Sequence, residues 1–105
     1  DWYYCKSFDT SDPLGPCVVT KDEIPQPNNL HIQLTVNGQI KQDGNTRDMV
    51  YYIPKIVSAV SQNVTLKPGD IISTGTLGGA LGTVVPGDVI EVTLEGVGTL
   101  RNPVV

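Results

Sequence analysis

A lysine set among aromatic residues is the side chain whose surroundings most favour chemistry. Lys6 lies within residues 2–8, a run with the sequence WYYCKSF. Such a run is expected to be buried because it holds four aromatic rings. A buried ammonium group must either reach water along its own aliphatic stem or meet a carboxylate or another anion. The residues alone leave these two interpretations even.

A glycine-rich segment at residues 74–82, with the sequence TGTLGGALG, is the second candidate. It follows a predicted strand directly, and such a loop lets backbone N–H groups approach an anion. It lacks the Gly-Lys-Ser/Thr ending of a P-loop, and its glycines do not have the spacing of a dinucleotide fingerprint. Spacing alone therefore favours the alternative interpretation, a flexible connector between strands.

The remaining ionisable residues show no convergence. His31, the one histidine, lies among polar residues on the outward face of a predicted strand, which favours a solvent-exposed side chain. Hard cations need several oxygen ligands that meet at one point. The acidic residues instead lie in loops or on the solvent side of a strand, and we interpret them as solvated charges: Asp22, Glu23, Asp43, Asp48, Glu91 and Glu95.

Composition and charge exclude several functional classes. The 105 residues suffice for one domain, and the net charge of −4 argues against binding to a nucleic-acid backbone. No apolar run is long enough to span a bilayer. Cys5 and Cys17 do not form a CxxC pair, and free, buried thiols are favoured over a disulfide between them.

The elements that must position these residues are mainly strands, because eleven Gly and eight Pro favour turns over long helices. Residues 29–43 predict a hairpin, with Asn37-Gly38 suited to a type I′ turn. A two-residue turn sets Ile40 opposite Thr35 on the polar face. Either both faces are then partly buried or the hairpin contains a bulge.

A helix is predicted over residues 54–62, because Pro54 suits its first position and apolar residues recur at helical spacing. Two Pro-Gly-Asp elements, at residues 68–70 and 86–88, predict type II turns that each lead into a strand. Residues 90–94 alternate between apolar and polar side chains, and residues 96–98 turn the chain toward a last strand.

Together these motifs resemble the fumarylacetoacetate hydrolase (FAH) family. No single segment is diagnostic, but the ordered set is highly specific and covers nearly the whole chain. The match is to the C-terminal half of the family's catalytic domain. The matching segments are residues 6–10 (KSFDT), 13–16 (PLGP), 19–24 (VTKDEI), 36–38 (VNG), 45–49 (NTRDM), 68–72 (PGDII), 74–76 (TGT) and 95–102 (EGVGTLRN).

The resemblance implies an α+β, mainly β fold of layered, mixed β-sheets, a β-sandwich roll with one or two short helices. Residues 1–105 would form the C-terminal portion of a single catalytic domain, in a protein that is often a homodimer. It also implies a cytoplasmic location, or a mitochondrial one in a eukaryote. No nucleic-acid or membrane partner is expected.

The function implied by the resemblance is metal-dependent chemistry on 2-oxo or 1,3-dicarbonyl acids. The reactions are C–C hydrolysis, decarboxylation or isomerisation, with acylpyruvates, fumarylacetoacetate or oxaloacetate as the type of substrate. The cation would be Mg²⁺ or Mn²⁺, with Ca²⁺ as an alternative. A divalent cation bound by two carbonyl oxygens stabilises the enolate that forms when the adjacent bond breaks.

The resemblance also assigns roles to individual residues. Lys6 matches a catalytic lysine beside the metal, where its charge would lie near the carboxylate ligands and the developing enolate. Thr10 would contribute an oxygen to the metal or hold a metal-bound water. Thr76, with the backbone of Gly75, would contact the substrate. The resemblance therefore reverses the preference for a flexible connector.

The sequence departs from the family pattern in ways that bear on activity. The carboxylate metal ligands and the catalytic His–Glu pair of the family lie upstream of anything in these residues. Leu77 stands where proline often follows, Cys17 stands where tryptophan is common, and residues 80–85 are shorter than the family loop. We therefore expect this segment to be part of a larger enzyme and inactive alone. The alternative is an inactive FAH-like fragment or assembly module.

Overall fold

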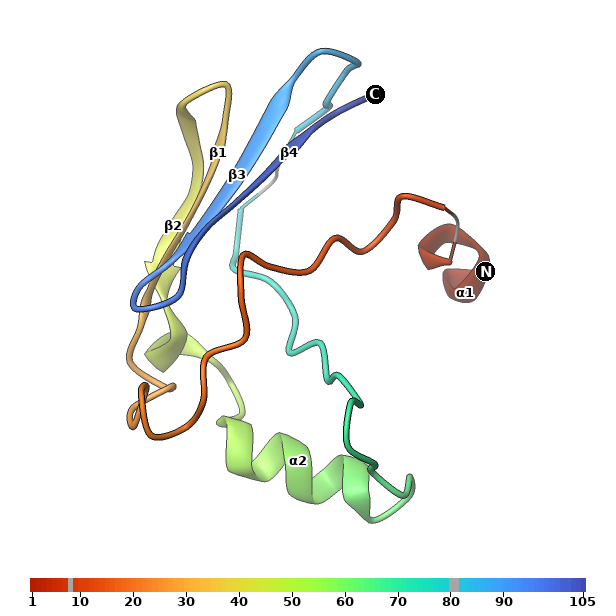
Figure 1. The fold of residues 1–105 in the computed structure, drawn as a ribbon, viewed down its shortest axis with the longest axis vertical. Coiled ribbons are helices and arrows are strands. Elements are labelled where there is room, and N and C mark those ends of the chain that lie inside the picture. The colour runs from red at the N-terminus through yellow and green to blue at the C-terminus, as the bar shows by residue number, and fades with distance from the viewer. Residues whose placement is uncertain (8, 80–81) are drawn as a thin grey trace.

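The computed structural model of the chain describes residues 1–7, 9–79 and 82–105. Its elements in chain order are α1 (Trp2–Lys6), β1 (His31–Val36), β2 (Gln39–Asn45), the 3₁₀ helix η1 (Thr46–Asp48), α2 (Ile53–Ser61), β3 (Val89–Leu94) and β4 (Gly98–Pro103). The four strands form one sheet in the order β2-β1-β3-β4 (Figure 1).

The predicted α+β, mainly β class with two short helices is confirmed. All three strand pairings in the described residues are antiparallel, so the sheet is not mixed. Two of the pairings have a local reason, because short turns join β1 to β2 and β3 to β4, and such turns only connect antiparallel neighbours. The pairing of β1 with β3 joins segments that are distant in sequence. Both predicted hairpins and the predicted helix at α2 are present.

The first hairpin contains the bulge that its sequence allowed. Thr35 pairs with Ile40, whereas Leu34 pairs with Gln42, so one extra residue, Lys41, stands between them. The two-residue turn places Ile40 opposite Thr35 on the polar side of the sheet, where 58% of it is exposed. The bulge returns the next residue, Gln42, to the apolar side.

The sheet has one polar face and one apolar face. Strand alternation places most apolar residues of β1, β3 and β4 on the same side. Their side chains are only partly covered, and Val36, at 7% exposure, is the one buried hydrophobic residue among those described. The residues that share this face are Ile32, Leu34, Val36, Ile90, Val92, Leu94 and Leu100.

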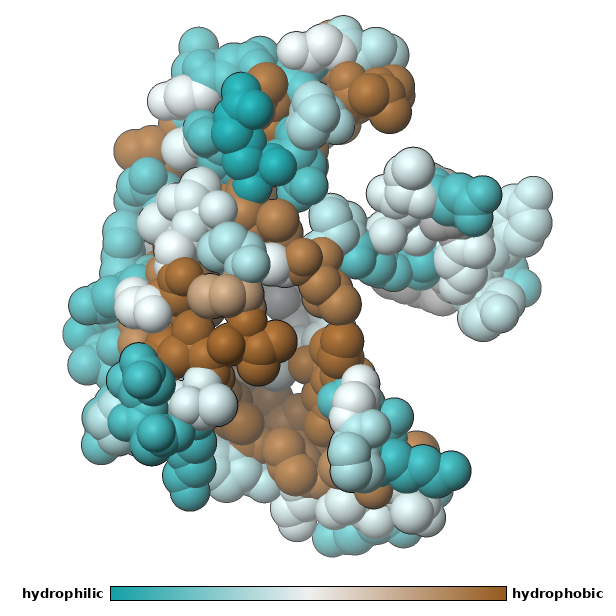
Figure 2. Space-filling view, in the orientation of Figure 1, coloured by the Kyte–Doolittle hydropathy of each residue, from teal (hydrophilic) through white to brown (hydrophobic). Residues whose placement is uncertain are grey.

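The chain is open rather than closely packed. It exposes 8242 Å², roughly 2,500 Å² more than a folded monomer of its mass of 11.3 kDa typically exposes. Its radius of gyration is 15.0 Å, against about 13 Å for a compact domain of this length. Figure 2 shows hydrophobic residues gathered around the hollow between the sheet and the side that carries α2.

Helix α1 stands apart from the sheet (Figure 1). Tyr3 and Tyr4 are 79% and 82% exposed, and Cys5 is an exposed free thiol. The predicted burial of the aromatic run is therefore wrong for these residues, because no described element of this chain packs over the helix. Phe8, which belongs to the same predicted run, lies outside the described residues.

The two Pro-Gly-Asp elements form the same turn. The N–H of Asp70 donates to the carbonyl of Lys67, and the N–H of Asp88 donates to that of Val85, each at a nitrogen–oxygen distance of 3.0 Å. Each aspartate side chain also accepts from the N–H at the start of its turn, over 2.7 and 2.9 Å. The two glycines have φ of 95° and 99°, as the predicted type II geometry requires.

The two turns lead to different structures. The second leads into β3, but residues 71–77 after the first turn join no strand ladder. The strand predicted there is wrong, because a strand also needs a neighbouring backbone to pair with. No such partner lies beside residues 71–77 among the residues that the structure describes.

The second turn predicts a specific pH dependence. The pKa of Asp88 is lowered from its ordinary value of 3.8, first by the Val85 N–H and then by the side-chain amide of Asn37, whose Nδ2 lies 2.8 Å from Oδ1 of Asp88. A lowered folded-state pKa stabilises the fold above pH 3.8. That contribution disappears as the pH falls through the folded-state pKa.

We expect Asn37→Gly to raise the pKa of Asp88 part of the way back toward 3.8, because one of its two strongest hydrogen-bond donors is lost. Glycine suits this position because Asn37 has a φ of 51°. A carboxylate NMR titration of the full-length protein measures the shift. The pKa of Asp43, which other donors lower, should stay unchanged in the same spectra. An unmoved Asp88 pKa would contradict the assignment.

Candidate functional site

A hollow of about 620 Å³ lies beside the apolar face of the sheet. Ile32, Leu34 and Val92 form its floor, and residues 45, 46 and 48–51, Ile56 of α2 and residues 74–78 form its walls. Figure 2 shows that its visible surface is mainly hydrophobic. The volume falls within the roughly 300–1,000 Å³ of small-molecule sites.

The lining carries little charge. Asp48 is the only formally charged residue among the described residues around the hollow. The other polar groups come from amides, hydroxyls and the backbone, chiefly at residues 42, 45, 46, 74 and 76. This surface can bury an apolar part of a ligand and hydrogen-bond its oxygens. A cationic partner for an anionic ligand must come from elsewhere.

Gln42 fixes the glycine-rich segment to the sheet. Its amide nitrogen, Nε2, donates to the carbonyl oxygens of Leu77 and Gly79, each over 3.1 Å. The hydroxyl of Thr76 donates to Oε1 of the same side chain over 3.4 Å. Gln42 is 9% exposed and is the one buried polar residue among those described. These contacts favour an anchored segment over a flexible connector.

The sequence analysis missed Gln42, although a signal was present. The polar alternation of the returning strand fails at Ile40, which indicates an irregularity such as a bulge in that strand. The bulge moves Gln42 onto the apolar face, opposite Leu34. A glutamine placed among apolar residues needs partners for its amide, and the neighbouring segment supplies them.

A second contact holds the same segment. The side chain of Leu77 lies directly over Gly44 of β2, where a Cβ atom would come within 3.0 Å of its Cδ2. Gly44 therefore provides the space that Leu77 occupies. The sequence identified Leu77 only as a departure from proline, and the structure shows that its side chain packs on the sheet.

The predicted site residues divide into two groups. Gly75 and Thr76 line the hollow, as a substrate-contacting pair must. Lys6 and Thr10 do not line it; both are exposed, Lys6 as the last residue of α1 and Thr10 in the turn that follows. Thr10 has a φ of 68°, an unfavourable conformation for a β-branched residue. Their proposed roles stay predictions.

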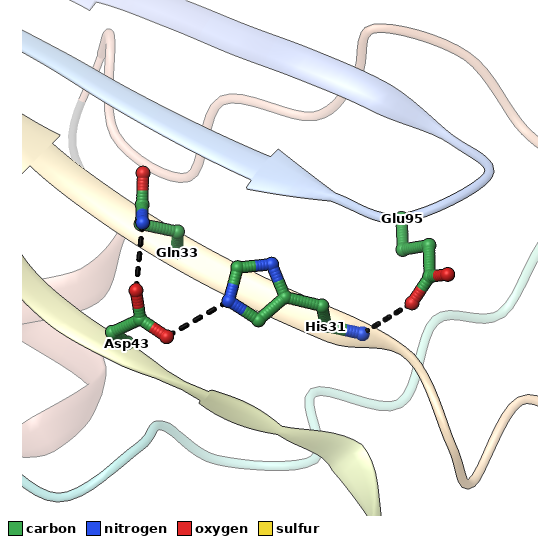
Figure 3. Close-up of polar contacts among 4 residues, drawn as sticks. All are labelled: His31, Gln33, Asp43 and Glu95. Atoms are coloured by element: carbon green, nitrogen blue, oxygen red, sulfur yellow. Dashed lines mark hydrogen bonds and ion pairs between the residues drawn. The ribbon is translucent and has the colours of Figure 1, made fainter.

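The polar face of the sheet lies opposite the hollow and carries the histidine. His31 Nε2 lies 2.8 Å from Oδ1 of Asp43, and Oδ2 of Asp43 accepts from Gln33 over 2.7 Å (Figure 3). Glu95 accepts from the backbone N–H of His31 over 2.8 Å. The pKa of Asp43 is lowered by the Gln33 amide and then by His31.

These contacts tie neighbouring strands together at the surface. His31 has a side-chain exposure of 51%, which confirms the predicted surface position. Nothing in this cluster faces the hollow, because successive strand residues point to opposite sides of the sheet. We therefore assign it to strand pairing rather than to the candidate site.

The described residues do not form a metal site by themselves. They contain no group of three or more His, Cys, Asp or Glu side chains that could hold an ion. Cys5 and Cys17 are free, as predicted, but exposed rather than buried, because their segment is not covered. In the same described portion, no helix has the length and apolar character needed to cross a membrane.

Comparison with known proteins identifies a family model and relatives that match this chain. A family model described as fumarylacetoacetate (FAA) hydrolase C-terminal matches residues 1–105. The chain is 44% identical over 100 residues to the 4-hydroxyphenylacetate degradation bifunctional isomerase/decarboxylase of Salmonella dublin. That alignment covers 95% of this chain and 23% of the relative.

Solved structures show the same fold. Maleylpyruvate hydrolase from Sphingobium sp. SYK-6 is 42% identical with a TM-score of 0.92, covering 97% of this chain and 38% of that protein. One of its structures is a complex with manganese(II) and pyruvate. The 2-hydroxyhepta-2,4-diene-1,7-dioate isomerase from Mycobacterium marinum is 42% identical with a TM-score of 0.91, covering 100% of this chain and 40% of that protein. The chain thus spans well under half of each.

The contact between Gly44 and Leu77 generates a prediction. Gly44→Ala should lower the free energy of unfolding of the full-length protein by about 1 kcal/mol, because the new methyl group forces Leu77 to move. Denaturant unfolding measures the change. Gly78→Ala is the matched control, since a Cβ there meets nothing within 4 Å and its φ is not in the left-handed region.

Removing the obstacle provides a second check on the same contact. Adding Gly44→Ala to a Leu77→Ala protein should lower the free energy of unfolding much less than adding it to the wild type does, because the clashing atoms are gone. Equal costs in the two backgrounds would show that Leu77 does not occupy the space above Gly44.

Proposed function

This chain belongs to the fumarylacetoacetate (FAA) hydrolase family, and on that premise we propose that its full-length protein converts 2-oxo or 1,3-dicarbonyl acids by C–C hydrolysis, decarboxylation or isomerisation. The relatives support this range, because their names include a hydrolase, an isomerase and an isomerase/decarboxylase. The structural observation that carries the proposal is the hollow itself, with Gly75 and Thr76 in its lining.

The geometry at Thr76 suits a ligand rich in oxygen atoms. Its hydroxyl hydrogen points to Gln42 over 3.4 Å, which is a long hydrogen bond. A carboxylate or carbonyl oxygen of a substrate can therefore take that hydrogen at little cost. Gly75 has a φ of 99°, and no atom outside its chain neighbours lies within 4 Å of where a Cβ would stand. The backbone there is open to a ligand.

We propose that the metal ligands and the cationic groups of the site come largely from protein beyond these residues. The manganese complex of the Sphingobium hydrolase supports a Mn²⁺ or Mg²⁺ requirement, with Ca²⁺ as an alternative. The described residues contain no cluster of His, Cys, Asp or Glu side chains that could hold such an ion, so in this proposal the chain contributes the hollow and its hydrogen-bonding groups.

Lys6 and Thr10 join the site in this proposal when α1 is covered. The support is the exposure of α1, because two adjacent tyrosines exposed to this degree are unusual on the surface of a complete domain. Protein packed against α1 would enclose Lys6 and give its ammonium group an anionic partner. The proposal treats residues 1–105 as the C-terminal portion of one catalytic domain. The homodimer and the cytoplasmic location stay predictions.

A substrate panel tests the function. Purified full-length protein is incubated with acylpyruvates, fumarylacetoacetate and oxaloacetate in the presence of Mg²⁺ or Mn²⁺, and again after chelation. We expect turnover of at least one acid that chelation removes and added cation restores. No turnover of any member in any condition would favour the alternative, an inactive module that kept the sheet and its hollow.

A lysine substitution tests the predicted catalytic residue. In the full-length enzyme, Lys6→Met should raise the activation free energy by about 2–4 kcal/mol, by analogy with the loss of one oxyanion donor, because a developing negative charge loses its partner. Steady-state kinetics measures the effect on kcat. Lys67→Met is the control, since Lys67 is exposed and uses only its backbone in its turn. An unchanged kcat would remove Lys6 from the site.

A further inference from the structure

We propose that Gln42 is a positioning residue, which holds the glycine-rich segment so that Thr76 and Gly75 present their hydrogen-bonding groups to the substrate. This inference rests on the proposed function, because it assumes that these two residues contact a substrate. It assigns a role to a residue that the sequence analysis did not select.

The orientation of the Gln42 amide is fixed by its partners. Two carbonyl oxygens, those of Leu77 and Gly79, lie 3.1 Å from Nε2 and can only accept hydrogen bonds. The amide nitrogen must therefore point toward these two carbonyl oxygens. That leaves Oε1 to face Thr76, whose hydroxyl donates to it. One side chain thus contacts three of the four residues from 76 to 79.

The position of Gln42 is in turn fixed by the sheet. Its backbone pairs with Leu34 in β1, immediately after the bulge, and β1 is an inner strand bonded on both sides. The segment itself has no strand ladder to hold it. Its placement over the hollow therefore depends on the Gln42 side chain and on the packing of Leu77 against Gly44.

Replacement by glutamate isolates the hydrogen bonds from the packing. Gln42→Glu keeps the size and shape of the side chain but replaces the donor nitrogen with an acceptor oxygen. While the carboxylate is ionised, that oxygen would face two carbonyl oxygens, with which it cannot form a hydrogen bond. Relief requires the segment to move away from β2, and Thr76 and Gly75 must move with it.

The first experiment compares Gln42→Glu with Gln39→Glu in the full-length enzyme. Gln39 lies on the same strand and is exposed, so it undergoes the same chemical change without touching the segment. We expect Gln42→Glu to lower kcat/KM by roughly 10²-fold, the effect of misplacing groups by about 1 Å. Gln39→Glu should change it less than about twofold, as expected of a surface change remote from the site.

Backbone amide NMR chemical shifts provide a readout that separates a local displacement from a general loss of stability. Gln42→Glu should change the amide shifts of residues 76–79 while leaving the amides of β3 protected from hydrogen exchange as in the wild type. Faster exchange throughout β3 would indicate general destabilisation and overturn the positioning role. Unchanged amide shifts in the segment together with unchanged kcat/KM would overturn it as well.

A double-mutant cycle tests whether Gln42 acts through Thr76. Thr76→Val removes the hydroxyl and keeps the side-chain shape, so its own loss of activity measures the proposed substrate contact. If Gln42 positions that hydroxyl, Gln42→Glu should lower kcat/KM by a much smaller factor in the Thr76→Val background than in the wild type. Equal fold-losses in both backgrounds would overturn the proposal.

The outcomes separate this inference from the proposed function. A loss of activity in Thr76→Val with none in Gln42→Glu overturns the role of Gln42 alone. A wild-type protein that turns over no 2-oxo acid overturns the proposed function. In that case the amide chemical-shift comparison of Gln42→Glu with Gln39→Glu decides by itself whether Gln42 holds the segment.

Discussion

A buried amide must have hydrogen-bond partners, and in this protein that requirement joins the sheet to the candidate site. The bulge at Lys41 turns Gln42 toward the apolar side, where water does not satisfy it fully. The carbonyl groups of the glycine-rich segment satisfy it instead. One irregularity in strand pairing therefore decides where a loop lies. The wall of the hollow that carries Thr76 and Gly75 depends on it.

The described residues leave the apolar face of the sheet only partly covered. The polar face of the sheet is complete, with cross-strand contacts such as those of Asp43 with His31 and Gln33 (Figure 3). Among the described residues, nothing of comparable extent covers the apolar face, and the exposed area exceeds that of a typical monomer of this mass. An uncovered apolar face and the small share of each relative that the chain spans fit together. Both agree with the proposal that protein beyond these residues completes the site.

The identical Pro-Gly-Asp turns separate local from non-local structure. Both form the same backbone hydrogen bond and the same aspartate contact, because proline, glycine and aspartate impose that geometry over four residues. Only the second turn leads into a strand, since β1 and β4 lie beside the residues that follow it. A turn can be predicted from its own residues. A strand depends on a neighbour from another part of the chain.

The sequence by itself determined the hairpins, the helix at α2, the two turns and the resemblance that identified the family. These depend on the alternation of apolar and polar residues, on turn chemistry and on ordered motifs, all of which can be recognised in the sequence itself. Only the tertiary structure decided that Gln42 holds the segment, that Gly44 makes space for Leu77, and that Lys6 lies apart from the hollow. Each of these is a contact, or the lack of one, between residues distant in sequence. Burial of α1 could not be predicted from its aromatic residues, because burial requires a second surface, and hydrophobic character alone does not supply one.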